Sequence, residues 1–247
     1  SFSDQEWVQL RAAAAAQDIQ FVPTVMWANA DAIHTALSNQ DRRQAHIQSI
    51  ATEVYAHNFD GIDIDYEAKY ARTRPYFSLF LKELQEAIGY DREILCTIES
   101  RTPLEDRYSS DESIPTDIEY ANDLTQINRY CDRVRVMAYD QGRIDLTLNG
   151  SKGDPYVPTA DIEWVEKVMR VAAKEIDPSK LIVGVPTYGY EYDMFPSIDG
   201  SDDISYARLW SFNPGYATEI AEKLNLTIDR NNADEAQLTF PASLSPE

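Results

Sequence analysis

The stretch Phe59-Asp60-Gly61-Ile62-Asp63-Ile64-Asp65-Tyr66-Glu67 decides how the rest of the chain is interpreted. Its last three acids, Asp63, Asp65 and Glu67, alternate with apolar residues. Side chains two positions apart in an extended strand share a face and are separated by about 6.6 Å. The three carboxyl groups therefore form one column, and the opposite face is apolar enough for helices to cover it. We expect a buried strand whose carboxyl end opens into a functional site.

Two other interpretations of this acid column (Asp63, Asp65 and Glu67) are less favoured. A solvated edge strand could use acids to discourage pairing, but three ionised carboxylates would then repel one another without serving any function. A calcium loop of the EF-hand type has polar residues between its ligands and a glycine after the first three. Here Gly61 precedes the acids, and isoleucines separate them.

Composition narrows the class of protein. The chain has 247 residues, of which 43% are hydrophobic, so it can build a folded core. Its formal net charge of −20 argues against nucleic acid and anionic lipid as partners, and a neutral or cationic partner fits better. We find no apolar run long enough to span a membrane and no signal peptide in residues 1–10. Cys96 and Cys131 are expected to be two buried thiols and not a disulfide.

Strand-like and helix-like segments alternate along most of the chain, which predicts a parallel sheet with right-handed crossovers. A loop rich in Gly, Pro and Asp is expected between residue 140 and Thr159, and the pattern changes after Tyr188, where we expect an acidic loop at 199–203 and a short helix at 218–223. The expected strands are 21–27, 59–67, 93–100, 133–140 and 181–188, and the expected helices are 4–18, 41–58, 75–88, 117–130 and a segment between Thr159 and Pro178.

Three motifs resemble those of one known family. The pattern Asp-Gly-x-Asp-x-Asp-x-Glu at 60–67 resembles the signature of glycoside hydrolase family 18, the chitinases and their relatives. Met137-Ala138-Tyr139-Asp140 resembles the Met-x-Tyr-Asp motif of that family, and residues 184–189 resemble its Gly-x-Pro-x-Tyr-Gly motif. All three follow expected strands and occur in the family's order. The resemblance implies a (β/α)₈ TIM barrel with its site at the carboxyl ends of the strands.

The resemblance also implies that this α/β barrel is incomplete here. By family order, the five expected strands are the third to the seventh, and we do not find the first two or the eighth. Residues 1–190 would be the partial barrel, and residues 191–247 part of an α+β insertion before a missing last strand. No residue matches the family's tryptophan at the end of the eighth strand, and residues 24–27 depart from the Ser-x-Gly-Gly of many chitinases.

In the family, a substrate-assisted mechanism replaces the usual pair of catalytic carboxylates. The resemblance makes Glu67 the general acid that protonates the glycosidic oxygen while the substrate's 2-acetamido carbonyl attacks the anomeric carbon. Asp65 would share a proton with Asp63 and then turn to the acetamide. Tyr139 would donate its hydroxyl to the acetamide oxygen, and Asp140 would bind sugar hydroxyls.

Four further residues are candidates for lining the substrate site: Met137, which would pack beneath the sugar, and Tyr188, Glu99 and Trp27, for which ordinary packing is about as good an explanation. Trp27 could stack on a sugar face. The resemblance calls for no cofactor and no metal.

The function implied is hydrolysis of β-1,4-linked N-acetylglucosamine-containing glycans, either chitin or peptidoglycan, with retention of configuration. Residues 149–159 and 164–168 are similar to those of bacterial members associated with spore cortex and cell-wall turnover. A non-catalytic carbohydrate-binding protein on the same fold is the alternative, and a structural or protein-inhibiting member is a weaker one. The presence of Glu67 favours the enzyme. We expect a monomer that is secreted or associated with the cell wall.

Overall fold

The computed structural model describes residues 4–196 and 204–241, so the acidic loop expected at 199–203 lies outside the described residues. The chain forms two compact units, each made of several segments. The first unit comprises residues 1–99, 116–137 and 172–183, and the second comprises 100–115, 138–171 and 184–247. The domain boundary expected at residue 190 stays a prediction.

The first unit is built on a five-stranded sheet, as the sequence predicts. Its strands are β1 (Thr24–Trp27), β2 (Gly61–Tyr66), β3 (Glu93–Glu99), β4 (Arg133–Met137) and β5 (Leu181–Gly184). They lie side by side in chain order, and the pairs β1–β2, β2–β3 and β3–β4 are parallel. Between the described residues no pairing joins β1 to β5, so this part of the chain does not close into a barrel by itself.

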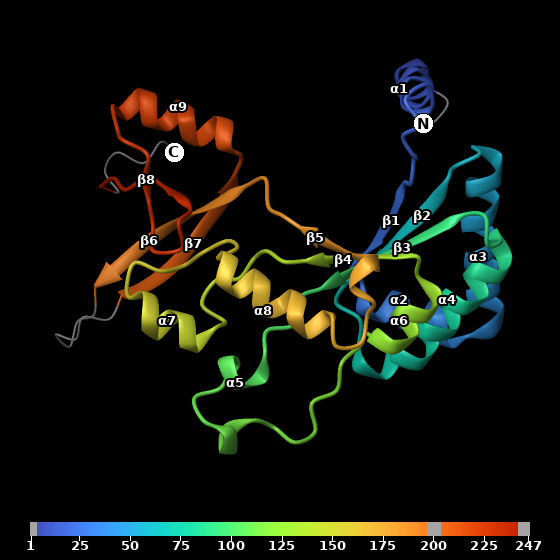
Figure 1. The fold of residues 1–247 in the computed structure, drawn as a ribbon, viewed down its shortest axis with the longest axis horizontal. Coiled ribbons are helices and arrows are strands. Elements are labelled where there is room, and N and C mark those ends of the chain that lie inside the picture. The colour runs from blue at the N-terminus through green and yellow to red at the C-terminus, as the bar shows by residue number, and fades with distance from the viewer. Residues whose placement is uncertain (1–3, 197–203, 242–247) are drawn as a thin grey trace. The chain divides into compact units, whose positions relative to one another are not determined.

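Helices α2, α3, α4 and α6 cover one face of this sheet (Figure 1). The first unit contains α1 (Gln5–Ala15), α2 (Ala30–Ser38), α3 (Gln40–Ala56), the short 3₁₀ turns η1 (Ala71–Thr73) and η3 (Pro178–Lys180), α4 (Arg74–Ile88) and α6 (Leu124–Tyr130). Apolar residues at helical spacing, such as Phe77, Leu81 and Leu84 of α4, are buried against alternate residues of the strands, such as Ile64 and Val134. The other face of the sheet is therefore left for polar side chains.

Three helices differ from those expected: two of them were not expected, and the third begins later than expected. Helix α2 was not expected at all, although the Asn29 side chain caps it by accepting from the backbone N–H of Ala32. Helix α6 begins at Leu124 and not at 117, because Asp123 caps its first turn. Residues expected to be a loop form α7 (Leu146–Lys152), which Asp145 caps. In each case a capping side chain sets the start of the helix.

Cys96 and Cys131 are joined in a disulfide, with their Cα atoms 6.0 Å apart, so the expectation of two free thiols is wrong. Cys96 lies on the helix-covered face of β3, and Cys131 follows α6, one of the covering helices. The two side chains therefore meet through the packing of a helix on a sheet. Their separation of 35 residues along the chain gave no sign of this.

Gly61, at the start of β2, is required by the close approach of the neighbouring strand. A Cβ atom at this position would lie 2.3 Å from the carbonyl oxygen of Glu93 in β3, closer than non-bonded atoms can come. Because this neighbour is backbone, it cannot move aside without shifting the strand. The glycine that opens the acid column thus sets the spacing of β2 and β3.

We expect Gly61→Ala to lower the free energy of unfolding by about 1–3 kcal/mol, because the added methyl group overpacks the junction of the two strands. Urea denaturation measures this. Gly150→Ala is the matched control, since nothing lies within 4 Å of a Cβ at that position in α7 and alanine favours a helix. Equal stability of the two variants would contradict the assignment of Gly61 to close strand packing.

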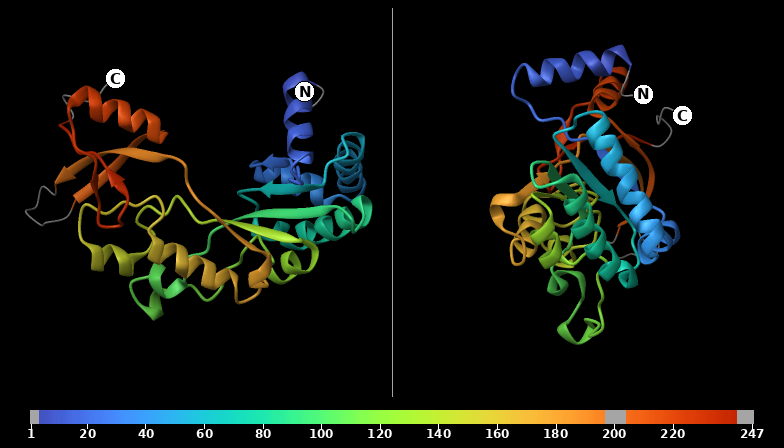
Figure 2. Two further views of the ribbon diagram at one scale, coloured as in Figure 1. Left: turned by 45° about the horizontal axis from the view of Figure 1, so that its top comes forward. Right: turned by 90° about the vertical axis from the view of Figure 1, so that its right-hand side faces the viewer.

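The second unit contains an antiparallel ribbon of β6 (Gly189–Pro196) and β7 (Ile204–Phe212). Helix α9 (Pro214–Leu224) lies along this ribbon in Figure 1 and in the left view of Figure 2. Its other elements are α5 (Leu104–Arg107), the 3₁₀ turn η2 (Asp111–Ser113), α7, α8 (Ile162–Ala172) and the short strands β8 (Asp229–Arg230) and β9 (Ala236–Gln237). The helix expected after Thr159 and the one expected at 218–223 are α8 and α9.

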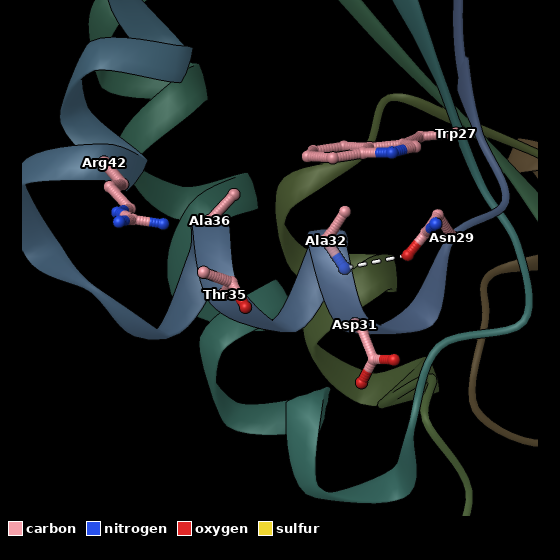
Figure 3. A pocket seen from close by; sticks show the side chains of 7 residues that line it. All are labelled: Trp27, Asn29, Asp31, Ala32, Thr35, Ala36 and Arg42. Atoms are coloured by element: carbon pink, nitrogen blue, oxygen red, sulfur yellow. Dashed lines mark hydrogen bonds between the residues drawn. The ribbon is translucent and has the colours of Figure 1, made fainter.

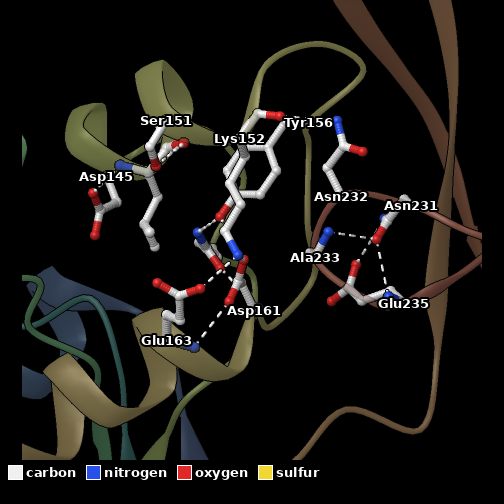
Figure 4. A network of polar contacts seen from close by, with 12 residues as sticks. Asp145, Ser151, Lys152, Tyr156, Asp161, Glu163, Asn231, Asn232, Ala233 and Glu235 are labelled. Carbon is white, nitrogen blue, oxygen red and sulfur yellow. Dashed lines mark hydrogen bonds and ion pairs between the residues drawn. The ribbon is translucent and has the colours of Figure 1, made fainter.

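Polar contacts hold the loop before α8 in the second unit (Figure 4). The Glu235 carboxylate accepts hydrogen bonds from the backbone N–H groups of Thr159 and Ala160, at 3.0 and 2.6 Å. The ammonium group of Lys152 pairs with Glu163 at 2.6 Å and lies 3.6 Å from the buried Asp161 carboxylate. These groups satisfy one another, so we interpret the network as structural support.

Candidate active site

The acid column lies on the face of the sheet that the helices leave uncovered. Ile64 and Tyr66 are fully buried on the helix-covered face, whereas Asp65 and Glu67 are half-buried. The alternation predicted for this strand is therefore present. The register pairs Asp65 with Met26 of β1 on one side and with Thr97 of β3 on the other.

Asp63 is the most enclosed member of the column, and its side chain is only 1% exposed. Its Oδ2 accepts hydrogen bonds from the hydroxyl of Thr24 at 2.8 Å and from Nη1 of Arg135 at 2.9 Å. Its Oδ1 accepts from the hydroxyl of Thr97 at 2.9 Å. Donors from β1, β3 and β4 thus converge on one carboxylate of β2 and hold it in place.

Asp65 has the opposite environment. Its Oδ1 is buried and has no hydrogen-bond partner. Burial, together with the negative charges of Glu67, Asp63 and Glu99, raises the pKa of Asp65 to about 6, and the charge of Lys69 opposes this rise. Within residues 4–196 and 204–241, Asp63 takes its hydrogen bonds from the two threonines and Arg135 and none from Asp65.

Glu67 directly follows β2, and its backbone N–H donates to the carbonyl of Trp27 at 2.8 Å. The next residue, Ala68, has φ of +54°, a left-handed conformation that is unusual for alanine and costs about 1–2 kcal/mol. The backbone N–H of Ala68 donates to Oε1 of Glu99 at 3.1 Å. The carboxylate of Glu99 therefore holds the strained turn that follows Glu67.

Glu99 makes two further contacts that fix its position. Its Oε2 accepts from the side-chain amide of Asn122 at 2.7 Å and lies 3.9 Å from the ammonium group of Lys69. The side chain of Lys69 is fully buried, and its nitrogen lies 4.7 Å from the centre of the Phe77 ring. Burial lowers the pKa of Lys69, while the nearby carboxylates of Glu99, Asp65 and Glu67 oppose that change. The sequence analysis identified Glu99 and missed Lys69.

In the second unit, Asp140 and two tyrosines form a separate polar cluster. Oδ1 of Asp140 accepts hydrogen bonds from the hydroxyls of Tyr188 and Tyr190, both at 2.6 Å. Burial and the neighbouring Asp140 raise the pKa of both tyrosines. The ring of Tyr139 lies edge-on to that of Tyr188, with 6.1 Å between centroids. Tyr139, Asp140 and Tyr188 are thus brought together as predicted, and Tyr190 joins them without having been identified.

The remaining two candidates are residues of the strands. Met137 is the last residue of β4, is half-buried and pairs in register with Glu99. Trp27 lies on the helix-covered face, with its ring centroid 5.7 Å from that of Tyr66 and 5.5 Å from that of His46. Its neighbour Met26 is 71% exposed and occupies the position beside Asp65. Trp27 therefore lies on the opposite face of the sheet from the acid column, and its stacking on a sugar stays a prediction.

Trp27 instead lines a shallow pocket above α2 (Figure 3). The polar groups of that pocket come from Asn29, Asp31, Thr35 and Arg42, and the Asn29 side chain is already engaged in capping α2. The pocket is distinct from the acid column, because adjacent residues of a strand point to opposite faces of the sheet. In the described ranges, 4–196 and 204–241, no group of three or more His, Cys, Asp or Glu side chains is arranged to hold a metal ion.

The fold and the acid column define an α/β protein with a candidate site at the carboxyl ends of parallel strands. The sequence model of Glycosyl hydrolases family 18 matches residues 10–238, so the chain belongs to that family. The family predicted from the three motifs is thereby confirmed. No helix of the described residues is long and apolar enough to cross a membrane.

Several proteins are similar to this chain. It is 29% identical over 181 residues to the "Uncharacterized glycosylase YvbX" of Bacillus subtilis, which covers 73% of this chain and 47% of that protein. It is 27% identical to "Probable chitinase 2" of Drosophila melanogaster over 77% of this chain and 39% of that protein. The spore cortex-lytic enzyme SleL of Bacillus cereus superposes with a TM-score of 0.68 at 18% identity, over 95% of this chain and 50% of that chain. Because SleL is only 18% identical to this chain, the similarity between the two shows a common fold and no more. The chain spans about half the length of these relatives, or less.

Proposed function

We propose that this chain carries the catalytic strands of a glycoside hydrolase that cleaves β-1,4-linked N-acetylglucosamine-containing glycans with retention of configuration. The observation that supports this most directly is the state of Asp65. Its unpaired Oδ1 and its pKa of about 6 mark a carboxyl group that is ready to exchange a proton and to accept a hydrogen bond from a ligand. Glu67, two residues further along the strand, supplies the acid that the reaction needs.

The reaction begins with proton donation by Glu67 to the glycosidic oxygen, as the C–O bond to the anomeric carbon breaks. The acetamide oxygen of the same sugar forms a new bond to that carbon and gives an oxazolinium ion. Asp65 accepts a hydrogen bond from the acetamide N–H and stabilises the positive charge of the oxazolinium ion. Water then attacks the anomeric carbon as the bond from that carbon to the acetamide oxygen breaks, and it gives a proton to the Glu67 carboxylate. This step restores the acid, and the two displacements together retain the configuration.

Tyr139, Asp140 and Tyr188 are assigned to substrate binding through their motifs. Tyr139 would donate to the acetamide oxygen, and Asp140, held by two tyrosine hydroxyls, would accept from sugar hydroxyls. Met137 would pack against the apolar face of a sugar. We assign Glu99 a supporting part instead, because its carboxylate is engaged by Ala68, Asn122 and Lys69.

The glycan is either chitin or bacterial peptidoglycan, and the likeness of residues 149–159 and 164–168 to cell-wall-lytic family members favours peptidoglycan. The protein would act as a monomer outside the cytoplasm, secreted or associated with the cell wall. The Cys96–Cys131 disulfide supports this location, because disulfides persist in oxidising compartments.

Carbohydrate binding without cleavage is the second candidate function. The position of Trp27 favours it, because this ring, a candidate for stacking on a sugar, lies on the face of the sheet opposite the acid column. A site with less contact to the sugar ring distorts the substrate less, and distortion contributes several kcal/mol to this class of reaction. The presence of Glu67 argues for the hydrolase.

Digestion of chitin oligomers and of purified muropeptides, with the anomers of the first products followed by ¹H NMR, tests the proposal. We expect cleavage of one of the two substrates, with the β-anomer formed first. Initial formation of the α-anomer would exclude the retaining mechanism. Calorimetric binding of either glycan without any product would instead identify a carbohydrate-binding protein.

A further inference from the structure

Arg135 is a positive charge between Val134 and Val136 in the middle of β4, and the family motifs give it no role. Its Nη1 lies 2.9 Å from Oδ2 of Asp63 and 3.2 Å from the hydroxyl of Thr97, and its side chain is 38% exposed. Thr97 pairs in register with Arg135 on one side and with Asp65 on the other. The arginine therefore reaches across β3 to the acid column of β2.

The charges around the column are arranged in order along it. Among the described residues, the charged groups around the column are two acids of β2, the acid that directly follows it, one acid of β3, and two cations that flank them. They are Asp63, Asp65 and Glu67, then Glu99, and finally Arg135 and Lys69. Arg135 pairs with Asp63 at one end, and Lys69 lies near Glu99 at the other. Asp65 is left between the two pairs, with no cation and no donor bound to its Oδ1.

Arg135 changes what Asp63 can do. An ionised carboxylate can only accept hydrogen bonds, and Asp63 accepts three, from Thr24, Thr97 and Arg135. Two neighbouring aspartates without a cation would lower their repulsion by sharing one proton. The positive charge of the Arg135 guanidinium group lowers that repulsion instead of a shared proton. The proton taken up by the column then belongs to Asp65.

We propose that Arg135 is a positioning residue that keeps Asp63 ionised and immobile, so that the exchangeable proton of the column resides on Asp65 instead of being shared between two aspartates. The part of Asp65 in the reaction rests on the proposed function. The charge of Asp63 remains in place throughout the reaction and disfavours ionisation of Asp65.

The test is a ¹³C NMR titration of the aspartate carboxyl carbons of the unchanged chain between pH 4.5 and pH 7.5. We expect the Asp65 resonance to move with a midpoint near pH 6 and the Asp63 resonance to stay at its ionised position throughout. Movement of both resonances together would show a shared proton and would overturn the proposal. The experiment needs no substrate, so its failure is distinguishable from failure of the proposed hydrolase activity.

Variants of β4 then test whether Arg135 is the cause. Arg135→Gln should make the Asp63 resonance titrate within this range and should move the Asp65 midpoint down by about half a pH unit or more, because Asp63 then takes up the proton. Arg135→Lys should restore most of the original behaviour by restoring the charge. Arg133→Gln is the matched control, since Arg133 lies in the same strand but pairs with Glu93 at 2.8 Å. An Asp63 titration that is unchanged in folded Arg135→Gln would also overturn the proposal.

Discussion

Glu67→Gln is expected to lower the rate of glycan cleavage by about 10²- to 10⁴-fold while leaving glycan affinity nearly unchanged. Glutamine has almost the same shape as glutamic acid but has no proton to give to the glycosidic oxygen. Its backbone N–H can still donate to the carbonyl of Trp27, so the turn after β2 is kept. Steady-state turnover measures the rate, on whichever of chitin oligomers and muropeptides the digestion experiment shows to be cleaved. Calorimetric binding of the same glycan measures the affinity.

Glu86→Gln is the matched control for this experiment. Glu86 is a half-exposed residue of α4 that pairs with Lys82 at 3.8 Å, and its loss should leave turnover unchanged. If the Glu67 variant keeps the turnover of the unchanged chain, Glu67 is not the general acid. If it loses binding and turnover together, Glu67 contributes to the structure of the site and its chemical role remains unproven.

Asp65→Asn is expected to have two opposite effects, and the first is on catalysis. The asparagine side chain cannot accept a charged hydrogen bond from the N–H of the substrate's acetamide group as a carboxylate does. It also cannot stabilise the positive charge of the oxazolinium ion. A charged hydrogen bond of this kind contributes about 1.5–3 kcal/mol, so turnover of an N-acetylated glycan should fall by about 10- to 150-fold. Cleavage of a substrate analogue without the acetamide should fall far less. Equal losses on the two substrates would argue against participation of the acetamide.

The second effect of Asp65→Asn is on stability, and its sign follows from the pKa of about 6. A carboxyl group whose pKa is raised by folding binds its proton more tightly in the folded state. The stabilisation it provides is complete below about pH 4 and is lost as the pH rises towards 6. Asparagine resembles the protonated form at every pH. The variant should therefore match the unchanged chain below about pH 4 and be more stable at pH 7, by about 1 kcal/mol after solvent screening is allowed for.

Thermal unfolding of the two chains at pH 4 and pH 7 measures this difference. Asp91→Asn is the control, because Asp91 is an exposed aspartate that forms a distant ion pair with Arg92, at 3.9 Å. A variant that is less stable than the unchanged chain at pH 7 would show that Asp65 is not held in an unfavourable charged state. Gain of stability with loss of activity is the usual relation at a functional site.

Much of the first unit could be predicted from the sequence, because its signals are local. Alternation of Ile62 and Ile64 with acids predicted β2, and the start signals at Thr73 and Pro75 placed α4 to within a residue or two. Helix α2 also carries local signals, namely Asn29 as its cap and the buried Ile33 and Leu37 one turn apart. It was missed because its nine residues sit between a strand and the longer helix α3.

The parts of the site that could not be predicted depend on register. β1 has only four residues, and moving a strand by one residue exchanges its two faces. The sequence alone therefore could not decide whether Met26 or Trp27 faces the acids. Arg135 shows the same difficulty, since its contact with Asp63 depends on how β2, β3 and β4 align. A usable signal was present, because a charged residue between Val134 and Val136 must face either solvent or a charged partner.

The Cys96–Cys131 disulfide has a consequence for the support of Glu67. The two cysteines close a covalent ring, and Glu99 and Asn122 both lie within it. Two groups on one ring lose less chain entropy when they meet than two groups on an open chain. The hydrogen bond between Glu99 and Asn122 is therefore favoured before the rest of the unit is assembled. Since Glu99 also binds the backbone of Ala68, a crosslink on the helix-covered side of the sheet limits the conformations open to the acid on its other side.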